Sequence, residues 1–187
     1  MTRARSSSAR PRRRSSAGNA GASSAGAGAT SAAGYGPLHQ GSDGAGSIRM
    51  PSHFCGVFGL KPSFGRVPYY PVGVGDLTSH MGPMTRSVAD SALMLEVMAG
   101  PHFLDYTTLE AGPANYLARL QEGVKGKRIA YSPDLGVARV DPEVADLVKA
   151  AVARFTELGA IVEEVPTPWA KEGPELIRFF WSAHMTR

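Results

Sequence analysis

The clearest pattern of apolar and polar positions lies over residues 142–158. Its apolar residues recur at intervals of three and four, which places them on one side of an α-helix: Val144, Leu147, Val148, Ala151, Val152, Phe155 and Leu158. Asp141 and Pro142 are typical residues of a helix start, and Gly159 is typical of the position beyond a helix end. The pattern predicts a helix from Pro142 to about Leu158 that buries one apolar stripe.

Two short apolar runs flank this helix and predict strands over residues 127–131 and 160–165. Such a strand–helix–strand alternation is typical of an α/β sheet covered by helices. We therefore expect an α/β fold.

A second helix is predicted over residues 88–98. Ser87 and Asp90 form a capping box at its start, and Gly100-Pro101 stops it. Its expected apolar face consists of Val88, Ala92, Met94 and Leu95. Residues 37–42 predict a short strand and residues 116–121 a short helix. The Gly and Pro residues between Pro62 and Pro83 predict an irregular segment with short extended pieces.

The composition fits one soluble, globular unit, because 43% of the 187 residues are hydrophobic and 19% are charged. The formal charge of +4 comes from six arginines within the first fourteen residues. The remainder has no basic excess, which argues against a nucleic-acid partner. Residues 1–17 predict a disordered Arg- and Ser-rich tail, with a polyanion-binding arm or a transit peptide as alternatives.

Other features of the composition narrow the class further. No apolar run approaches the roughly 20 residues of a membrane span, so no membrane partner is expected. Cys55 is the only cysteine, which excludes an internal disulfide and favours a reducing cytoplasm.

One run, Gly-Ser-Asp-Gly-Ala-Gly-Ser-Ile-Arg-Met-Pro over residues 41–51, carries the candidate chemistry. Its three small residues allow backbone N–H groups to point into one space, and the hydroxyl of Ser47 follows them. A nucleophile beside an oxyanion hole has this composition.

This run, together with Phe-Cys-Gly-Val-Phe-Gly-Leu-Lys-Pro over 54–62 and Gly-Pro-Met-Thr-Arg-Ser-Val-Ala-Asp over 82–90, resembles the amidase signature family. The resemblance extends from about Gly18 to the C-terminus and includes residues 126–131 and 140–144. Members of that family hydrolyse amide bonds with a Ser–cisSer–Lys triad. The resemblance implies a partial amidase signature domain over residues 18–187, a mixed sheet covered by helices, and strands missing at both ends.

The resemblance also assigns roles to residues. Ser47 takes the place of the nucleophile, and Gly44, Ala45 and Gly46 take that of the oxyanion donors. The relay serine with the cis peptide bond falls on Ser23, within Gly-Ala-Ser-Ser-Ala-Gly over residues 21–26. The two serine hydroxyls are then expected to converge.

Three further residues, Ser24, Asp43 and Arg49, correspond to positions that support the loop by hydrogen bonds in this family. The Ala-rich run over residues 25–33 could by composition be a flexible linker. The resemblance favours a helix packed behind the cis-serine instead.

The chain departs from the family at the general base, which is a lysine several dozen residues before the cis-serine. None of the 22 residues before Ser23 is a lysine, and Lys61 belongs to a different motif. Ala22 and Ala25 replace glycines of the upstream turn, which would be costly if either position required a positive φ.

The expected activity is hydrolysis of a small carboxamide by an acyl-enzyme route, without metal or cofactor. A Ser–His mechanism through His39 or His53 is disfavoured, because neither has a matching carboxylate in a hydrolase order. Two alternatives stay open. One is a non-catalytic remnant, and the other is the amidase component of a tRNA-dependent amidotransferase, which typically has Leu-Asp-Gln-Ile where residues 78–81 stand here. A homo-oligomer is also left open.

Overall fold

The computed structural model describes residues 18–72, 77–110, 115–166 and 172–185. These residues cluster into two compact units that divide after Leu117, and each unit is described by itself. The disordered tail predicted over residues 1–17 lies outside the described residues. The single domain predicted over residues 18–187 remains a prediction.

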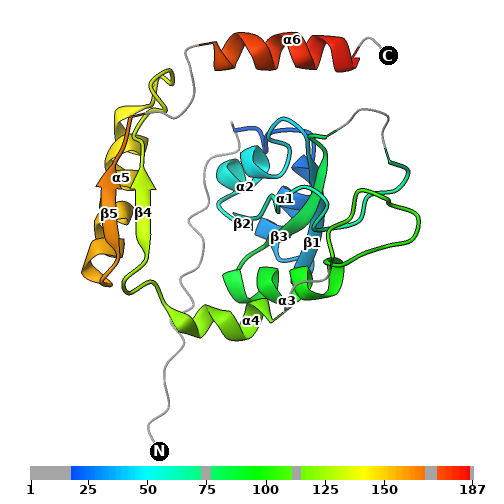
Figure 1. Cartoon of the computed structure of the whole chain (residues 1–187), viewed down its shortest axis with the longest axis horizontal. Helices are drawn as coiled ribbons and strands as arrows, with labels where there is room; N and C mark the ends of the chain where they lie inside the picture. Colours follow the sequence, from blue (N-terminus) through cyan, green and yellow to red (C-terminus); the bar gives the residue numbers. More distant parts are fainter. Residues whose placement is uncertain (1–17, 73–76, 111–114, 167–171, 186–187) are drawn as a thin grey trace, which may run out of the picture. The chain divides into compact units, whose positions relative to one another are not determined.

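The first unit is built on a three-stranded antiparallel sheet (Figure 1). Its strands are β1 (Leu38–Asp43), β2 (Phe58–Gly59) and β3 (His80–Thr85), in the order β1-β3-β2. Leu38 pairs with Thr85 and Asp43 with His80, so β3 runs the full length of β1. Strand β1, predicted over residues 37–42, leads directly into the candidate nucleophile run.

Three helices pack around this sheet: α1 (Ala25–Ala33), α2 (Arg49–Cys55) and α3 (Val88–Met98). Helix α1 confirms the helical alternative over the linker, and it ends at Gly34, where φ is +81°. Helix α3 has the predicted bounds, and the Ser87 hydroxyl accepts a hydrogen bond from the Asp90 N–H at 3.1 Å.

The core of the first unit lies between the sheet and its helices. Its buried apolar residues are Ile48, Val67, Met84, Ala92 and Leu95. The predicted apolar face of α3 is therefore buried at Ala92 and Leu95, but it was wrong for Val88, which is exposed. Val88 is the first residue of α3 and lies at the end of the helix, beyond the packed turns.

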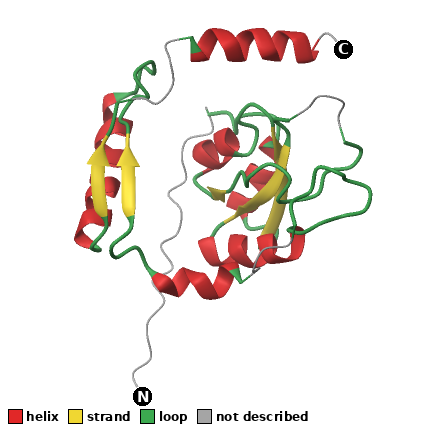
Figure 2. Cartoon of the chain, in the orientation of Figure 1, coloured by secondary structure: helices red, strands yellow, loops and turns green. Residues whose placement is uncertain are grey.

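The remaining part of the chain forms a strand–helix–strand unit followed by a helix (Figure 2). Its elements are α4 (Tyr116–Arg119), the 3-10 turn η1 (Leu120–Glu122), β4 (Arg128–Tyr131), α5 (Pro142–Glu157), β5 (Ile161–Glu164) and α6 (Gly173–Met185). Strands β4 and β5 pair in parallel, with Arg128 opposite Ile161. The predicted alternation is confirmed, and so is the α/β class.

The start of α5 is also as predicted, because the Asp141 carboxylate caps the N–H of Glu143 at 2.9 Å. The prediction of a buried stripe on α5 was wrong. No residue of α5 is buried, and Leu147 and Leu158 are 65% and 64% exposed. The two strands beside it contain no buried residue either, so this small sheet is too narrow to cover the stripe.

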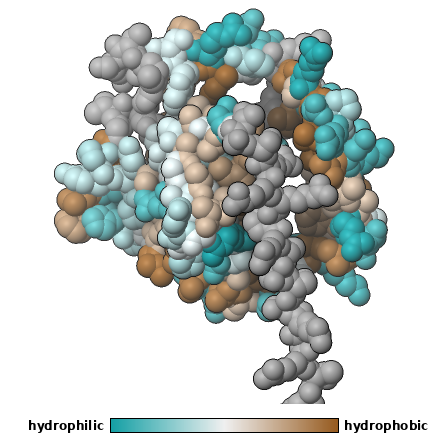
Figure 3. Space-filling view, turned by 180° about the vertical axis from the view of Figure 1, so that it is seen from behind, coloured by the Kyte–Doolittle hydropathy of each residue, from teal (hydrophilic) through white to brown (hydrophobic). Residues whose placement is uncertain are grey.

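Apolar side chains are consequently visible at the surface, and Figure 3 shows brown and teal regions side by side on the face it presents. Among the described residues, no helix is long and apolar enough to span a membrane.

Candidate active site

The candidate nucleophile loop connects the end of β1 to the start of α2. Asp43 is the last residue of the strand, and Arg49 is the first residue of the helix. Between them Gly46 has a φ of +114°, a backbone conformation that favours glycine. The Gly46 carbonyl accepts a hydrogen bond from the Met50 N–H at 2.7 Å, so the loop closes back onto the first turn of α2. Ser47 lies within this closed loop and is partly exposed.

Asp43 is fully buried beneath the loop and organises it. Oδ1 accepts from the Gly46 N–H (2.6 Å) and from Arg49 Nη2 (2.9 Å). Oδ2 accepts from the Ile48 N–H (3.2 Å) and from the backbone N–H and Nε of Arg49 (3.3 and 2.9 Å). Lys61 Nζ lies 3.9 Å from Oδ1. One carboxylate therefore fixes both the backbone of the loop and a guanidinium.

These hydrogen bonds decide the charge of Asp43. Burial by itself raises the pKa of the carboxyl, but the hydrogen bonds from the Arg49 side chain and from the N–H groups of Gly46, Arg49 and Ile48 outweigh it. They hold the pKa of Asp43 well below its ordinary value, so the group is a carboxylate at any physiological pH. It is a fixed acceptor rather than an acid or a base.

The three predicted oxyanion donors differ in the structure. The N–H of Gly46 is directed at Asp43 and is engaged there. Within the described part of the chain, the N–H groups of Gly44 and Ala45 make no hydrogen bond. Sequence reasoning missed this difference, although the Asp43–Gly46 spacing of three is typical of a side chain that bonds a nearby backbone N–H.

The turn that carries Ser23 is tied to the nucleophile loop through its neighbour. The Ser24 N–H donates to the Ser47 carbonyl at 3.3 Å. The Ser24 hydroxyl accepts from the Ser42 N–H (3.1 Å) and donates to the Ser42 carbonyl (3.2 Å). The peptide bond between Ala22 and Ser23 is cis, and Ser23 is exposed. The structure thus brings the two serine-bearing segments together, while the convergence of their hydroxyls stays a prediction.

The two alanines of the upstream turn carry no backbone cost. Neither Ala22 nor Ala25 has a positive φ, whereas Gly21 has one of +76°. A Cβ at Gly21 would also lie 3.1 Å from Pro51 N and Phe54 Cδ2. The turn therefore requires glycine at position 21 and tolerates alanine at the two replaced positions.

The histidines near the loop have structural surroundings. His39 Nδ1 lies 3.1 Å from the Thr30 hydroxyl, and Nε2 lies 3.3 Å from the Gly36 carbonyl. His53 is exposed on α2, with its ring edge-on to Phe54. The described residues hold no group of three or more His, Cys, Asp or Glu side chains placed to bind a metal ion.

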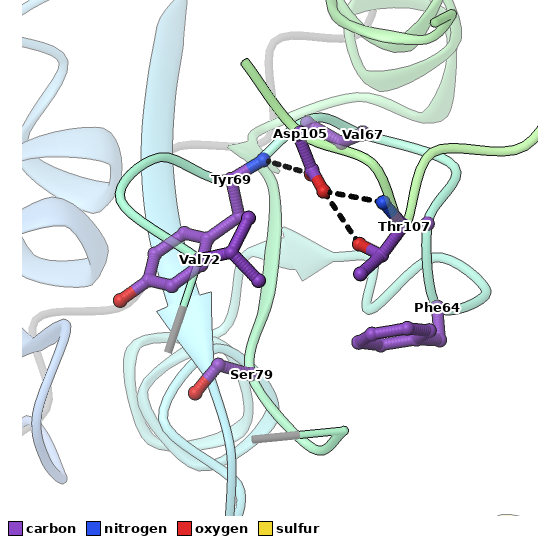
Figure 4. A pocket seen from close by; sticks show the side chains of 8 residues that line it. Phe64, Val67, Tyr69, Val72, Ser79, Asp105 and Thr107 are labelled. Atoms are coloured by element: carbon purple, nitrogen blue, oxygen red, sulfur yellow. Dashed lines mark hydrogen bonds between the residues drawn. The ribbon is translucent and has the colours of Figure 1, made fainter. Parts of the chain in front are cut away.

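A separate small pocket lies elsewhere in the first unit, between residues 64–79 and 105–107 (Figure 4). Its carboxylate, Asp105, is buried and accepts from the Tyr69 N–H (2.8 Å), the Thr107 N–H (2.9 Å) and the Thr107 hydroxyl (2.6 Å). Burial raises the pKa of Asp105, but these hydrogen bonds and the neighbouring His102 lower it below its ordinary value overall. The carboxylate holds two chain segments together.

A family model described as Amidase matches residues 9–186, so the chain belongs to the Amidase family. The predicted family is confirmed. The chain is 46% identical over 149 residues to an acylamidase of Rhodococcus erythropolis, in an alignment that covers 79% of this chain and 31% of that protein. It is 44% identical over 129 residues to a glutamyl-tRNA(Gln) amidotransferase subunit of Moorella thermoacetica, which covers 68% of this chain and 26% of that protein.

Solved structures give the same result. A bacterial aryl acylamidase of the amidase signature family superposes with a TM-score of 0.74 at 38% identity, covering 82% of this chain and 32% of that one. A 6-aminohexanoate cyclic dimer hydrolase superposes with a TM-score of 0.71 at 33% identity, covering 78% and 32%. The chain spans about a third of the length of these relatives.

Proposed function

We propose that this chain carries the nucleophile and relay serines of an amidohydrolase site that cleaves the C–N bond of a small carboxamide. The observation that carries the proposal is the hydrogen bond from the Ser24 N–H to the Ser47 carbonyl. It holds the turn with Ser23 against the loop with Ser47. Membership of the Amidase family supports an amide as the substrate.

In the proposed reaction, the Ser47 oxygen attacks the amide carbon and gives its proton to the Ser23 hydroxyl. Ser23 in turn passes a proton to the leaving nitrogen, and the C–N bond breaks. Backbone N–H groups of the Gly44–Ser47 segment stabilise the negative oxygen, with Gly44 and Ala45 supplying the donors that are not engaged elsewhere. Water then releases the acid from the acyl-enzyme. Ser24, Asp43 and Arg49 hold the loop and the turn in place.

The base is the weak element of this site. The family uses a lysine upstream of the cis-serine, and none of the residues before Ser23 is a lysine. Lys61 lies beside the Asp43 carboxylate, where a positive charge is stabilised. Because general-base assistance typically contributes about 10²–10⁴-fold, we expect slow turnover by this chain.

The test is hydrolysis of para-nitroacetanilide by three proteins: this chain, its Ser47→Ala variant, and a version extended upstream by a lysine-bearing segment. The proposal expects slow release of nitroaniline by the chain, none by Ser47→Ala and a large gain in the extended version. Equal rates for the chain and Ser47→Ala would contradict it and favour a non-catalytic remnant.

A second candidate is a component of an amidotransferase, because several of the similar proteins carry that description. Residues 78–81, Thr-Ser-His-Met, depart from the sequence that is typical of such a component at this position. Hydrolysis of a simple aryl amide without partner proteins would favour the amidohydrolase. The single cysteine also leads us to place the protein in the cytoplasm.

A further inference from the structure

Two exposed apolar side chains follow the nucleophile loop on α2. Met50 and Phe54 are 43% and 53% exposed. Residues four apart on a helix lie on the same face, so the two side chains are neighbours. The His53 ring lies edge-on to Phe54, with the ring centroids 5.4 Å apart. Together Met50 and Phe54 form a continuous apolar surface, here termed the α2 ledge.

The α2 ledge touches both segments that carry the candidate catalytic serines. Cγ and Cε of Met50 lie 3.3 Å from the position that a Cβ on Gly46 would take, directly before Ser47. Cδ2 of Phe54 lies 3.1 Å from the corresponding position on Gly21, two residues before Ser23. Both glycines have a positive φ, and neither leaves room for a larger residue under the ledge.

The ledge shares an accessible surface with the groups proposed for the chemistry. Ser23 and Ala45 are exposed and Ser47 is partly exposed, as are the two ledge residues. Arg49, which lies between the nucleophile and the ledge in sequence, directs its guanidinium to Asp43. A molecule that brings its carbonyl carbon to Ser47 therefore meets an apolar neighbour at Met50.

We infer that the α2 ledge binds the apolar group of the substrate, so that the site prefers amides with an aryl or alkyl substituent over small polar amides. This inference rests on the proposed function and deepens it. Burial of an apolar group against the ledge removes both surfaces from water, and a thioether makes favourable contacts with aromatic rings. Residues 50 and 54 are thus specificity-determining positions.

The test is a fluorine NMR titration of the chain with para-fluorophenylacetamide and with fluoroacetamide. We expect the aryl amide to bind at least about tenfold more tightly. Met50→Gln keeps the length of the side chain but makes it polar, and it should abolish most of this preference. Phe54→Ala should reduce it, whereas Met50→Leu should retain it. Leu93→Gln, at a residue on α3 that is 45% exposed, is the matched control and should leave it unchanged.

Thermal melting checks that each variant is folded, and the two ledge positions provide independent readings. An aryl preference that survives both Met50→Gln and Phe54→Ala would overturn the inference, and so would a chain with no aryl preference. Modification of Ser47 by a fluorophosphonate, measured on the same samples, separates the two proposals. Modified Ser47 with an unchanged preference refutes the ledge alone, and a lost preference with unmodified Ser47 refutes the nucleophile alone.

Discussion

Asp43 is the residue on which the geometry of the loop depends. A buried carboxylate is costly unless donors surround it, and here three backbone N–H groups and the Arg49 guanidinium do so. Because the donors come from residues on both sides of Ser47, the same contacts fix the backbone that carries the hydroxyl. The loop is therefore held by its own aspartate before any substrate binds.

Asp43→Asn should lower the free energy of unfolding by roughly 3 kcal/mol at neutral pH, because an amide cannot accept all of these donors and leaves Arg49 unpaired. The lowered pKa of Asp43 gives the pH dependence. Its stabilisation is complete above the unfolded-state pKa and is lost as the pH falls below it. Urea titrations should show a constant difference between the two proteins from pH 5 to 8 that narrows below about pH 4. A difference that does not change with pH would argue against a charged Asp43.

The two serines of the upstream turn should separate stability from reactivity. Ser24→Ala removes both hydrogen bonds to Ser42 and should lower the free energy of unfolding by about 1–2 kcal/mol. Ser23→Ala changes an exposed side chain and should leave thermal melting unaltered while slowing modification of Ser47 by a fluorophosphonate. If Ser23→Ala leaves that rate unchanged, Ser23 is not the relay.

Among the elements, the close approach of β3 and the segment after β2 depends on glycine. A Cβ on Gly82 would overlap the Leu60 carbonyl oxygen, which belongs to the backbone and cannot rotate away. Gly26 in α1 has nothing within 4 Å of its Cβ position. The two positions form a matched pair for the same substitution.

Gly82→Ala should destabilise the chain by roughly 3 kcal/mol, because the backbone must move to admit the methyl group. Gly26→Ala should stabilise it by roughly 0.5 kcal/mol, since alanine favours a helix. Chemical denaturation of both variants measures the difference. Equal stability of the two variants would mean that β3 and residue 60 do not approach as closely as the structure shows.

Elements with capping residues were predictable from the sequence, and those without them were not. Ser87 and Asp141 mark the starts of α3 and α5, and both helices begin there. Helix α2 has only seven residues and no polar N-cap, since Ile48 precedes it. Strand β3 contains Gly82-Pro83, a pair that usually interrupts a strand. Its pairing with β1 is a tertiary interaction that local sequence does not reveal.

For the molecule as a whole, resemblance predicted more of the site than pattern did. The roles of Ser23, Ser47 and Asp43 came from motif wording, and the hydrogen bonds around Asp43 and Ser24 fit those roles. The engagement of the Gly46 N–H by Asp43 could not be foreseen, because it depends on how the loop closes. The exposed stripe of α5 was equally unforeseen, since a pattern identifies an apolar face without showing what covers it.

The proposed function depends above all on Ser47 as the nucleophile. Covalent modification of the chain by a fluorophosphonate, read by intact mass and peptide mapping, examines this role without intermediate assumptions. We expect one adduct per chain on the peptide that contains Ser47, lost in Ser47→Ala and kept in the control Ser63→Ala, which changes an exposed serine. An adduct on a different residue, or one that persists in Ser47→Ala, would show that Ser47 is not the nucleophile.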